Sequence, residues 1–393
     1  MRIVRTFHPV GQGAFYSERF YDDNHQDAIH NIVYDCGTLL GYIRKAKKVV
    51  SQAFDKKDVI DYLFISHLDY DHISLVETLL SSVRGVKNIV LPLIALDELQ
   101  VVMAYQQMSE NSVETVSFLQ RIINHMKGQS RNDYWDGEYR VLFVRDEETD
   151  NVEVGNAGYW INGSQHQTSL LPDWVLVPYN THYRSRRLEL IKKLDGVIKK
   201  TEFIEELRLI GETTIKNGEF LYEKLRDESF VTKVITNTVL KNAIKSAYEK
   251  LPGGINDNSL LLYSGPTPEV DSYKQMDYCP CYPSCWHRYH EPGCLYTGDS
   301  ICNIQKWKNA VFYDVWNNIG TIQLPHHGSL ESFDVTKNTI DKQYVFPVSF
   351  GSKNSFGHPS GKVISFLLAQ DCIPVMVSEM ANTAYYQKIY RRV

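Results

Sequence analysis

The sequence contains no apolar run long enough to cross a membrane, because a spanning helix needs about 20 consecutive apolar residues. Its first residues also lack the apolar core of a secretory signal. No internal repeat and no low-complexity linker interrupts the chain. We therefore expect a cytoplasmic protein with no membrane partner, folded as one large domain or as two to three modest ones.

The sequence also has little net charge. The value of −5 over 393 residues neither indicates nor excludes a nucleic-acid substrate. Basic side chains can still gather on one face of a protein, where they would attract a polyanion.

The seven cysteines are an odd number, and four of them lie within residues 279–294. Such a cluster favours a metal over a disulfide framework and fits a reducing compartment. We predict a structural zinc that fixes a loop with no core of its own. Its predicted ligands are Cys279, Cys281, Cys285 and Cys294, with His287 or His290 as a substitute for one thiolate. The alternatives are free reduced thiols or a disulfide formed on isolation, because Cys-x-Cys replaces the usual Cys-x-x-Cys.

Hydrophobic patterns divide the chain into two strand-rich blocks with a helical segment between them. Strands are predicted at 2–9, 14–20, 31–35, 62–65, 88–91, 139–144, 159–161, 174–177, 259–263, 295–297, 321–324, 344–350 and 374–377. Helices are predicted at 39–54, 73–83, 96–126 (long or broken), 303–310 and 362–368. Residues 184–252 read as an insertion of two to four helices. We expect one α/β domain built from two halves, 1–183 and 253–393.

Four side chains that can bind metal lie in one short stretch, Ser66-His67-Leu68-Asp69-Tyr70-Asp71-His72. The stretch follows an apolar strand and precedes a helical pattern, so its side chains fan out at a strand end. Carboxylates and imidazoles suit zinc, manganese or iron, and no thiolate there demands a softer ion. The alternative interpretation is a polar turn in which Asp69 or Asp71 caps the helix.

Three further motifs match the same chemistry. Asp299 follows a strand and Gly298, where a carboxylate can approach and bridge two ions, although a Gly-Asp pair alone usually marks a turn. His326 and His327 end another strand before Gly-Ser, and each could also be an exposed or core histidine. His358 begins a helix, where it could hold a phosphate or protonate a leaving group, or be structural.

Together these motifs resemble those of the metallo-β-lactamase superfamily, and within it the ComEC-like hydrolases. They follow the family's order along the chain: Val10-Gly11-Gln12-Gly13, Asp35-Cys36-Gly37, Ser66 to His72, Asn258-Ser259-Leu260, Thr297-Gly298-Asp299, Pro325 to Ser329 and Gly357-His358-Pro359. The resemblance implies a four-layer αββα sandwich with a metal centre at one edge of its paired sheets. The helical insertion and the cysteine-rich loop lie outside it.

The resemblance also implies two divalent ions, zinc or manganese, and their ligands. The first ion would use His67 and Asp69. The second would use Asp71, His72, a bridging Asp299 and one histidine of the next pair, assigned here to His326. Asp69 stands where most of the superfamily has histidine, and this oxygen ligand favours manganese beside zinc. A third histidine for the first ion has no clear equivalent; the order of preference is His182, then His125 and His166.

The predicted function is metal-dependent phosphodiester hydrolysis, with DNA or RNA as the expected substrate. Asp71 would orient the nucleophilic water, and His327 and His358 would neutralise charge on the phosphate oxygens. Basic and aromatic residues of the insertion could follow a nucleic-acid backbone, or form an ordinary solvated helix face. They are Tyr183, Arg184, Arg186, Arg187, Lys192, Lys193, Lys199 and Lys200. The alternatives are a subunit of a multi-protein assembly, such as a defence system, that binds a protein partner through the insertion, or a hydrolase of small esters or lactones.

Overall fold

A computed structural model describes residues 1–23, 27–109, 113–129, 139–145, 152, 154–163, 166–167, 173–180, 186–251, 259–268, 273–278 and 291–391. Within these residues the chain forms a mixed α/β fold with two sheets and twelve α-helical segments. None of the described helices is both long enough and apolar enough to span a membrane.

The first sheet has nine strands in the order β11-β16-β1-β2-β3-β4-β5-β6-β7. Their bounds are β1 (Arg2–Phe7), β2 (Phe15–Tyr21), β3 (Ala28–Cys36), β4 (Val59–Phe64), β5 (Gly85–Pro92), β6 (Arg140–Arg145), β7 (Gly158–Ile161), β11 (Tyr273–Tyr278) and β16 (Tyr385–Arg391). Strands β3 to β7 run parallel, and Tyr34 of β3 lies opposite Phe64 of β4. The end of β3, with Asp35 and Cys36, and the residues that follow β4 from Ile65 therefore lie side by side.

The second sheet has seven strands in the order β15-β14-β13-β12-β10-β9-β8. Their bounds are β8 (His166–Gln167), β9 (Trp174–Asn180), β10 (Leu260–Pro266), β12 (Gly293–Tyr296), β13 (Ile319–Ile322), β14 (Val345–Ser349) and β15 (Ile373–Val377). Strands β12 to β15 are parallel, so the segments after β12, β13 and β14 meet at one edge. Asp299, the His326-His327 pair and Ser349 lie at these strand ends.

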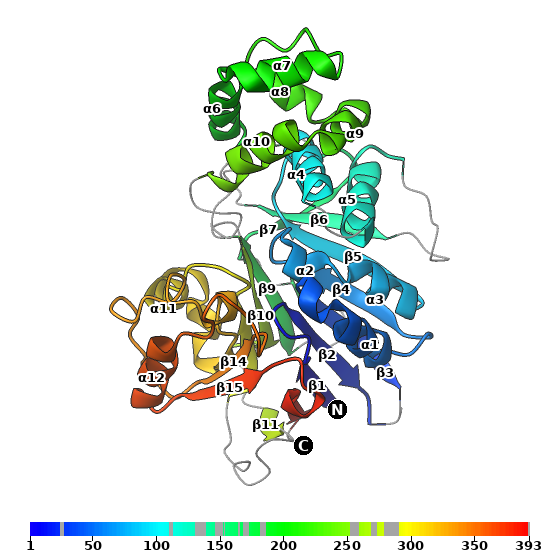
Figure 1. Ribbon diagram of the computed structural model, residues 1–393. Helices are drawn as coiled ribbons and strands as arrows, with labels where there is room; N and C mark the ends of the chain where they lie inside the picture. The colour runs from blue at the N-terminus through cyan, green and yellow to red at the C-terminus, as the bar shows by residue number, and fades with distance from the viewer. Residues whose placement is uncertain are drawn as a thin grey trace.

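Twelve helical segments accompany the sheets (Figure 1). They are α1 (Ile43–Ala53), α2 (Tyr70–Ile73), α3 (Val76–Ser82), α4 (Leu96–Met108), α5 (Val113–Met126), α6 (Arg187–Ile198), α7 (Thr201–Leu209), α8 (Gly218–Lys224), α9 (Glu228–Thr236), α10 (Thr238–Glu249), α11 (Ile304–Lys306) and α12 (Gly361–Ala369). Helices α6 to α10, drawn in green, form a separate group beside α4.

Three buried clusters account for the packing. One joins side chains of both sheets, including Tyr34 and Tyr296, whose rings stack with centroids 5.0 Å apart. A second joins the other face of the first sheet to α1, α3, α4, α5 and the insertion helices. The third joins the second sheet to the helical segments after β12 and to α12. The insertion thus shares a continuous apolar core with the rest of the chain.

Several sequence predictions need correction. The insertion contains five helices, not two to four. The predicted helix at 73–83 is two helices, because the Leu75 amide donates to the Cys36 carbonyl oxygen at 2.9 Å. Strands β11 and β16 were not predicted. β16 pairs with β1 from the other end of the chain, a contact that no local pattern reveals.

Candidate metal centre

The stretch from His67 to His72 spans the loop after β4 and the short helix α2. Its backbone is fixed from the second sheet, where the Leu260 amide donates to the Ser66 carbonyl oxygen at 2.8 Å. From the first sheet, the Ala14 amide donates to the Asp71 carbonyl oxygen at 3.1 Å. A Cβ atom at Gly37 would lie only 2.5 Å from that same oxygen. Glycine is therefore required beside the Asp71 turn, which explains the Asp-Cys-Gly motif.

A first group of possible ligands comprises His67, His72 and Asp299, all buried. The Asp299 oxygens lie 3.2 Å from His72 Nε2 and 3.9 Å from His67 Nε2. Asp299 is held there because its amide is directed at the Ser259 hydroxyl, 3.3 Å away, and because Gly298 takes a positive φ of 54°. These three side chains come from both sheets and face one point.

A second group comprises Asp71, His72 and His327. His327 Nε2 lies 3.1 Å from Asp71 Oδ2, and His72 Nε2 lies 4.0 Å from the same oxygen. The two groups share His72. Because His72 Nε2 has one lone pair, it can bind only one ion, so the two groups mark two adjacent positions. Asp299, with one oxygen toward His67 and the other toward His72, is the side chain that could bridge them.

Asp35 determines how His72 presents its ring. Its Oδ2 accepts a hydrogen bond from His72 Nδ1 at 2.8 Å, so the Nε2 lone pair points into the site. The same carboxylate accepts the Ser66 amide and hydroxyl, both at 2.7 Å. The sequence shows Asp35 as part of the Asp-Cys-Gly motif but does not assign it a role. Its place at the end of a strand, before Cys-Gly, is the only signal for one.

His326 and His327 make different contacts, although they are adjacent in the sequence. His327 Nδ1 donates to the Ser349 carbonyl oxygen at 2.8 Å, which leaves the Nε2 lone pair able to bind a metal ion. His326 Nδ1 lies 2.8 Å from the Ser332 hydroxyl, and its Nε2 lies 3.6 Å from Asp299. The sequence left open which histidine binds metal. In the structure His327 belongs to the second donor group, while His326 faces Asp299 from outside both groups.

Asp69 and His358 lie at the margin of the site. Asp69 occupies the N-cap position of α2, yet its side chain makes no capping hydrogen bond. Its Oδ2 instead lies 3.6 Å from His67 Nε2. The His358 ring lies 5.6 Å from the His326 ring, measured between centroids, and burial lowers its pKa. A neutral imidazole there can donate one hydrogen bond to a substrate oxygen.

The residues present fit divalent metal ions. The Nε2 atoms of His67 and His72 are buried and make no hydrogen bond to any described residue. Such atoms are costly to bury unless something binds them. Burial opposes ionisation of Asp299, but His72, His326 and His67 hold its pKa well below the usual value. Buried imidazole nitrogens beside an ionised carboxylate are a donor set that suits zinc or manganese.

Other predicted ligands are placed differently or lie outside the described residues. His182, Cys279, Cys281, Cys285, His287 and His290 are outside them. Cys294 lies in β12, within the buried cluster between the sheets, where burial raises the pKa of its thiol to about 12. His125 lies in α5 against Tyr139, and for His166 only the backbone in β8 is described. The structural zinc therefore stays a prediction.

Two comparisons with known proteins bear on this site. No curated protein sequence matches the chain. Residues 29–92, which include β3, β4, β5 and the stretch from His67 to His72, match the family model described as the metallo-beta-lactamase superfamily. Over these residues the chain is therefore similar to the metallo-beta-lactamase superfamily, which implies a metal-dependent hydrolase.

Proposed function

We propose that this protein is a two-metal phosphodiesterase. The observation that carries the proposal is the pair of adjacent donor groups at the strand ends. Two divalent ions held there would lower the pKa of a water molecule and clamp the oxygens of an in-line phosphoryl displacement. The first ion would be held by His67 and Asp299, and the second by Asp71, His72 and His327. Asp299 could bridge them, because one of its oxygens faces His67 and the other faces His72.

The positions of the other polar side chains around the donor groups suggest what each would do in catalysis. Asp71 is partly exposed and lies 3.1 Å from His327 Nε2, so it can orient the attacking water as well as bind metal. His326 and His358 lie next to each other outside the two donor groups. Their N–H groups are suited to the non-bridging oxygens of the phosphate. Removing one donor of this kind typically costs about 10²- to 10³-fold in rate. This exchanges the roles that the sequence gave to His326 and His327.

We propose the four-layer αββα arrangement and the ComEC-like subgroup as the framework of this site. The three buried clusters support the layers, because one lies between the sheets and each of the others joins one sheet to helices. The order of the short motifs supports the subgroup.

Nucleic acid remains one proposed substrate. Lys192, Lys193, Lys199 and Lys200 are exposed on or after α6 and could attract a phosphate backbone. The support from arginine is weaker, because Arg187 contacts Asp97 at 3.6 Å and Glu223 at 3.2 Å. The described insertion, residues 186–251, holds 14 basic and 11 acidic residues, a modest positive excess.

The test is hydrolysis by metal-stripped protein reloaded with Mn²⁺ or Zn²⁺. The substrates are bis(4-nitrophenyl) phosphate, plasmid, single-stranded DNA, RNA, 4-nitrophenyl acetate and a lactone. We expect the phosphodiesters to be cleaved and the carboxylic esters to be poor substrates. Asp71→Asn should abolish the activity, and Asp314→Asn, at an exposed aspartate on the second sheet's side, should not. No cleavage of any phosphodiester with either ion would contradict the proposal.

A second candidate function is that of a subunit in an assembly. It is favoured by exposed apolar side chains on the insertion, chiefly Leu209 of α7 and Phe220 of α8. Replacing both with Ser should leave hydrolysis unchanged. If the proposed phosphodiesterase activity fails while these two residues are needed for a complex isolated from the native cell, the subunit role is the better account.

A further inference from the structure

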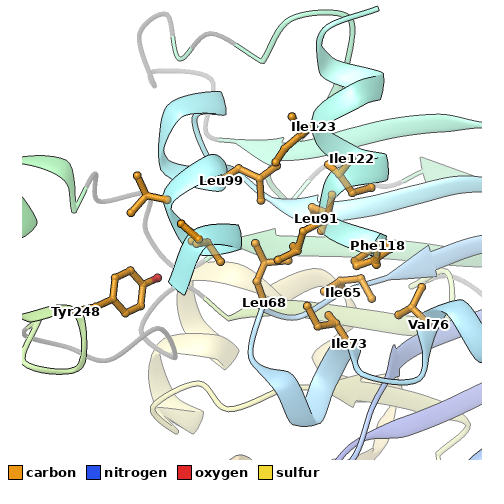
Figure 2. Close-up of a cluster of buried hydrophobic side chains, with 14 of the residues drawn as sticks. Ile65, Leu68, Ile73, Val76, Leu91, Leu99, Phe118, Ile122, Ile123 and Tyr248 are labelled. Atoms are coloured by element: carbon orange, nitrogen blue, oxygen red, sulfur yellow. The ribbon is translucent and has the colours of Figure 1, made fainter. Parts of the chain in front are cut away.

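The insertion helices form a pocket that opens beside the metal centre. His67 lines it at one end, and the rest of the lining comes from the region of α4 and from α6, α8 and α10. The core side contributes Leu68, Leu93 and Val102, and the insertion side contributes Leu190, Tyr222 and Tyr248. In Figure 2 Tyr248 faces α4 from the insertion, and Leu68 follows β4 on the core side. The pocket thus joins a metal-ligating histidine to an apolar space.

We propose that this pocket binds an apolar alkyl or aryl group of the substrate while the phosphodiester lies at the metal centre. The inference rests on the proposed phosphodiesterase function and specifies its substrate class. In the reaction, the oxygen of a water molecule bonds to phosphorus, the bond from phosphorus to the leaving alkoxide or phenoxide breaks, and the water's protons pass to the products or solvent. The alkyl or aryl group stays esterified to the phosphorus and lies in the pocket, on the His67 side of the metal centre.

The polar residues of the lining are occupied with one another, which leaves the pocket apolar in character. Glu98 accepts the backbone amides of Arg186 and Arg187, at 2.8 Å and 3.3 Å, at the start of α6. The Arg187 side chain contacts acidic residues and lies over the Tyr222 ring, 5.3 Å from its centroid. Tyr222 in turn donates to Asp97 at 3.2 Å.

The side chains that line the pocket are held in place by packing contacts. Tyr248 stacks on Tyr105 of α4, with ring centroids 4.2 Å apart. Leu190 and Leu68 are buried in the cluster that runs through the insertion and the first sheet. A preformed apolar pocket favours ligands that bury carbon and make few hydrogen bonds. A polynucleotide offers a charged sugar-phosphate backbone and bases whose edges need hydrogen bonds, and neither matches this mostly apolar lining as well as an alkyl or simple aryl group does.

The experiment uses 4-nitrophenyl alkyl phosphodiesters with methyl, butyl and octyl groups, and the full chain reloaded with Mn²⁺. Each methylene that becomes buried should raise kcat/KM by about fourfold, from the usual transfer free energy of a CH₂ group. We therefore expect butyl to exceed methyl by at least about tenfold, and the gain to level off when the pocket is full.

Leu190→Trp should fill the pocket and bring the butyl-to-methyl ratio close to one. The matched control is Leu188→Trp, on the same helix, where Leu188 is 70% exposed and the ratio should be unchanged. Val102→Phe fills the space from α4 instead, so the test survives if the tryptophan variant fails to fold. Calorimetry provides a readout besides activity: butylphosphonate should bind more tightly than methylphosphonate, and only in proteins with an open pocket.

The outcomes separate the two proposals. If no phosphodiester is cleaved, the proposed function fails, and calorimetry still decides whether the pocket binds apolar groups. If all three are cleaved with equal kcat/KM and the two phosphonates bind equally, the pocket proposal alone is wrong. A third outcome would also contradict the pocket proposal and favour a nuclease. In it, the protein cleaves polynucleotides, Leu190→Trp leaves that cleavage unchanged, and kcat/KM for the small phosphodiesters does not depend on alkyl length.

Discussion

The two donor groups of the metal centre differ in their access to solvent. Asp299, in the first group, is 5% exposed, whereas Asp71, in the second, is 17% exposed and neighbouring Asp69 is 29% exposed. The first group is enclosed by both sheets, and the second opens toward the rim. We infer that the enclosed group fixes an ion and that substrate oxygens approach from the Asp69 and Asp71 side. Asp299, with one oxygen toward His67 and the other toward His72, connects the two positions.

The largest effect is expected from Asp299→Ala, because the two oxygens of this carboxylate face His72 and His67 and can contact both ions. Both ions should be lost and phosphodiester hydrolysis should fall by at least about 100-fold, since even indirect partners of metal ligands are worth 10- to 100-fold. Metal analysis of the purified protein and steady-state rates measure the two effects. His125→Ala, on α5 away from the site, is the control. Retention of two ions by the Asp299 variant would contradict a bridging role for this carboxylate.

The next effect concerns Asp35, which supports the proposed ligand His72. Asp35→Asn keeps the shape of the side chain, and asparagine tolerates the positive φ of 56° at this position. It weakens the acceptor for His72 Nδ1, so metal affinity should fall by about 10- to 100-fold. Competition with a chromogenic chelator measures the affinity.

Asp58→Asn is the matched control for Asp35→Asn. Asp58 is also a buried aspartate, paired with Arg19 at 2.7 Å, but it precedes β4, whereas the metal site follows that strand. Its loss should lower the free energy of unfolding and leave metal affinity unchanged. Equal losses of affinity in both variants would mean that Asp35 only stabilises the fold.

A smaller and more selective effect should distinguish the two adjacent histidines. His327→Ala removes one ligand of the open group, so the protein should keep one ion and lose the other. His326→Ala should keep both ions and lose about 10²-fold in rate if the side chain contacts substrate oxygens. Measuring both the number of bound ions and kcat for each variant distinguishes the roles of the two histidines. If His326→Ala loses one ion and His327→Ala keeps both, His326 is the ligand, as the sequence analysis assigned.

The sequence predicted the strand-end stretch from His67 to His72 because apolar strands and polar loops alternate there within a few residues. It did not predict the support of the site, because Asp35 and Ser349 act through contacts between distant segments. The choice between His326 and His327 depends on positive φ values of 49° and 54°, which turn adjacent imidazoles in different directions. The pocket beside His67 was also beyond prediction, since α4 and α10 meet only in the folded chain.

The smallest effect is expected at Asp69, on the more exposed side of the metal centre. Its carboxylate lies 3.6 Å from His67 Nε2 and makes no capping hydrogen bond, so it is available to an ion. Oxygen ligands suit manganese, whereas imidazole suits zinc better. Asp69→His should therefore lower the ratio of the Mn²⁺-supported rate to the Zn²⁺-supported rate by a few-fold. Partial exposure leaves room for the larger ring.

Asp69→Asn is the control for this change, because it keeps an oxygen donor and removes only the charge. Both rates should fall with this variant, while their ratio stays near that of the unaltered protein. The same experiment at Asp299 should behave differently: Asp299→His has no space in the enclosed group and should lose metal outright. If Asp69→His and Asp69→Asn change the ratio equally, the side chain at this position acts through charge alone. The open group would then owe its metal preference to Asp71, the other exposed carboxylate of the site.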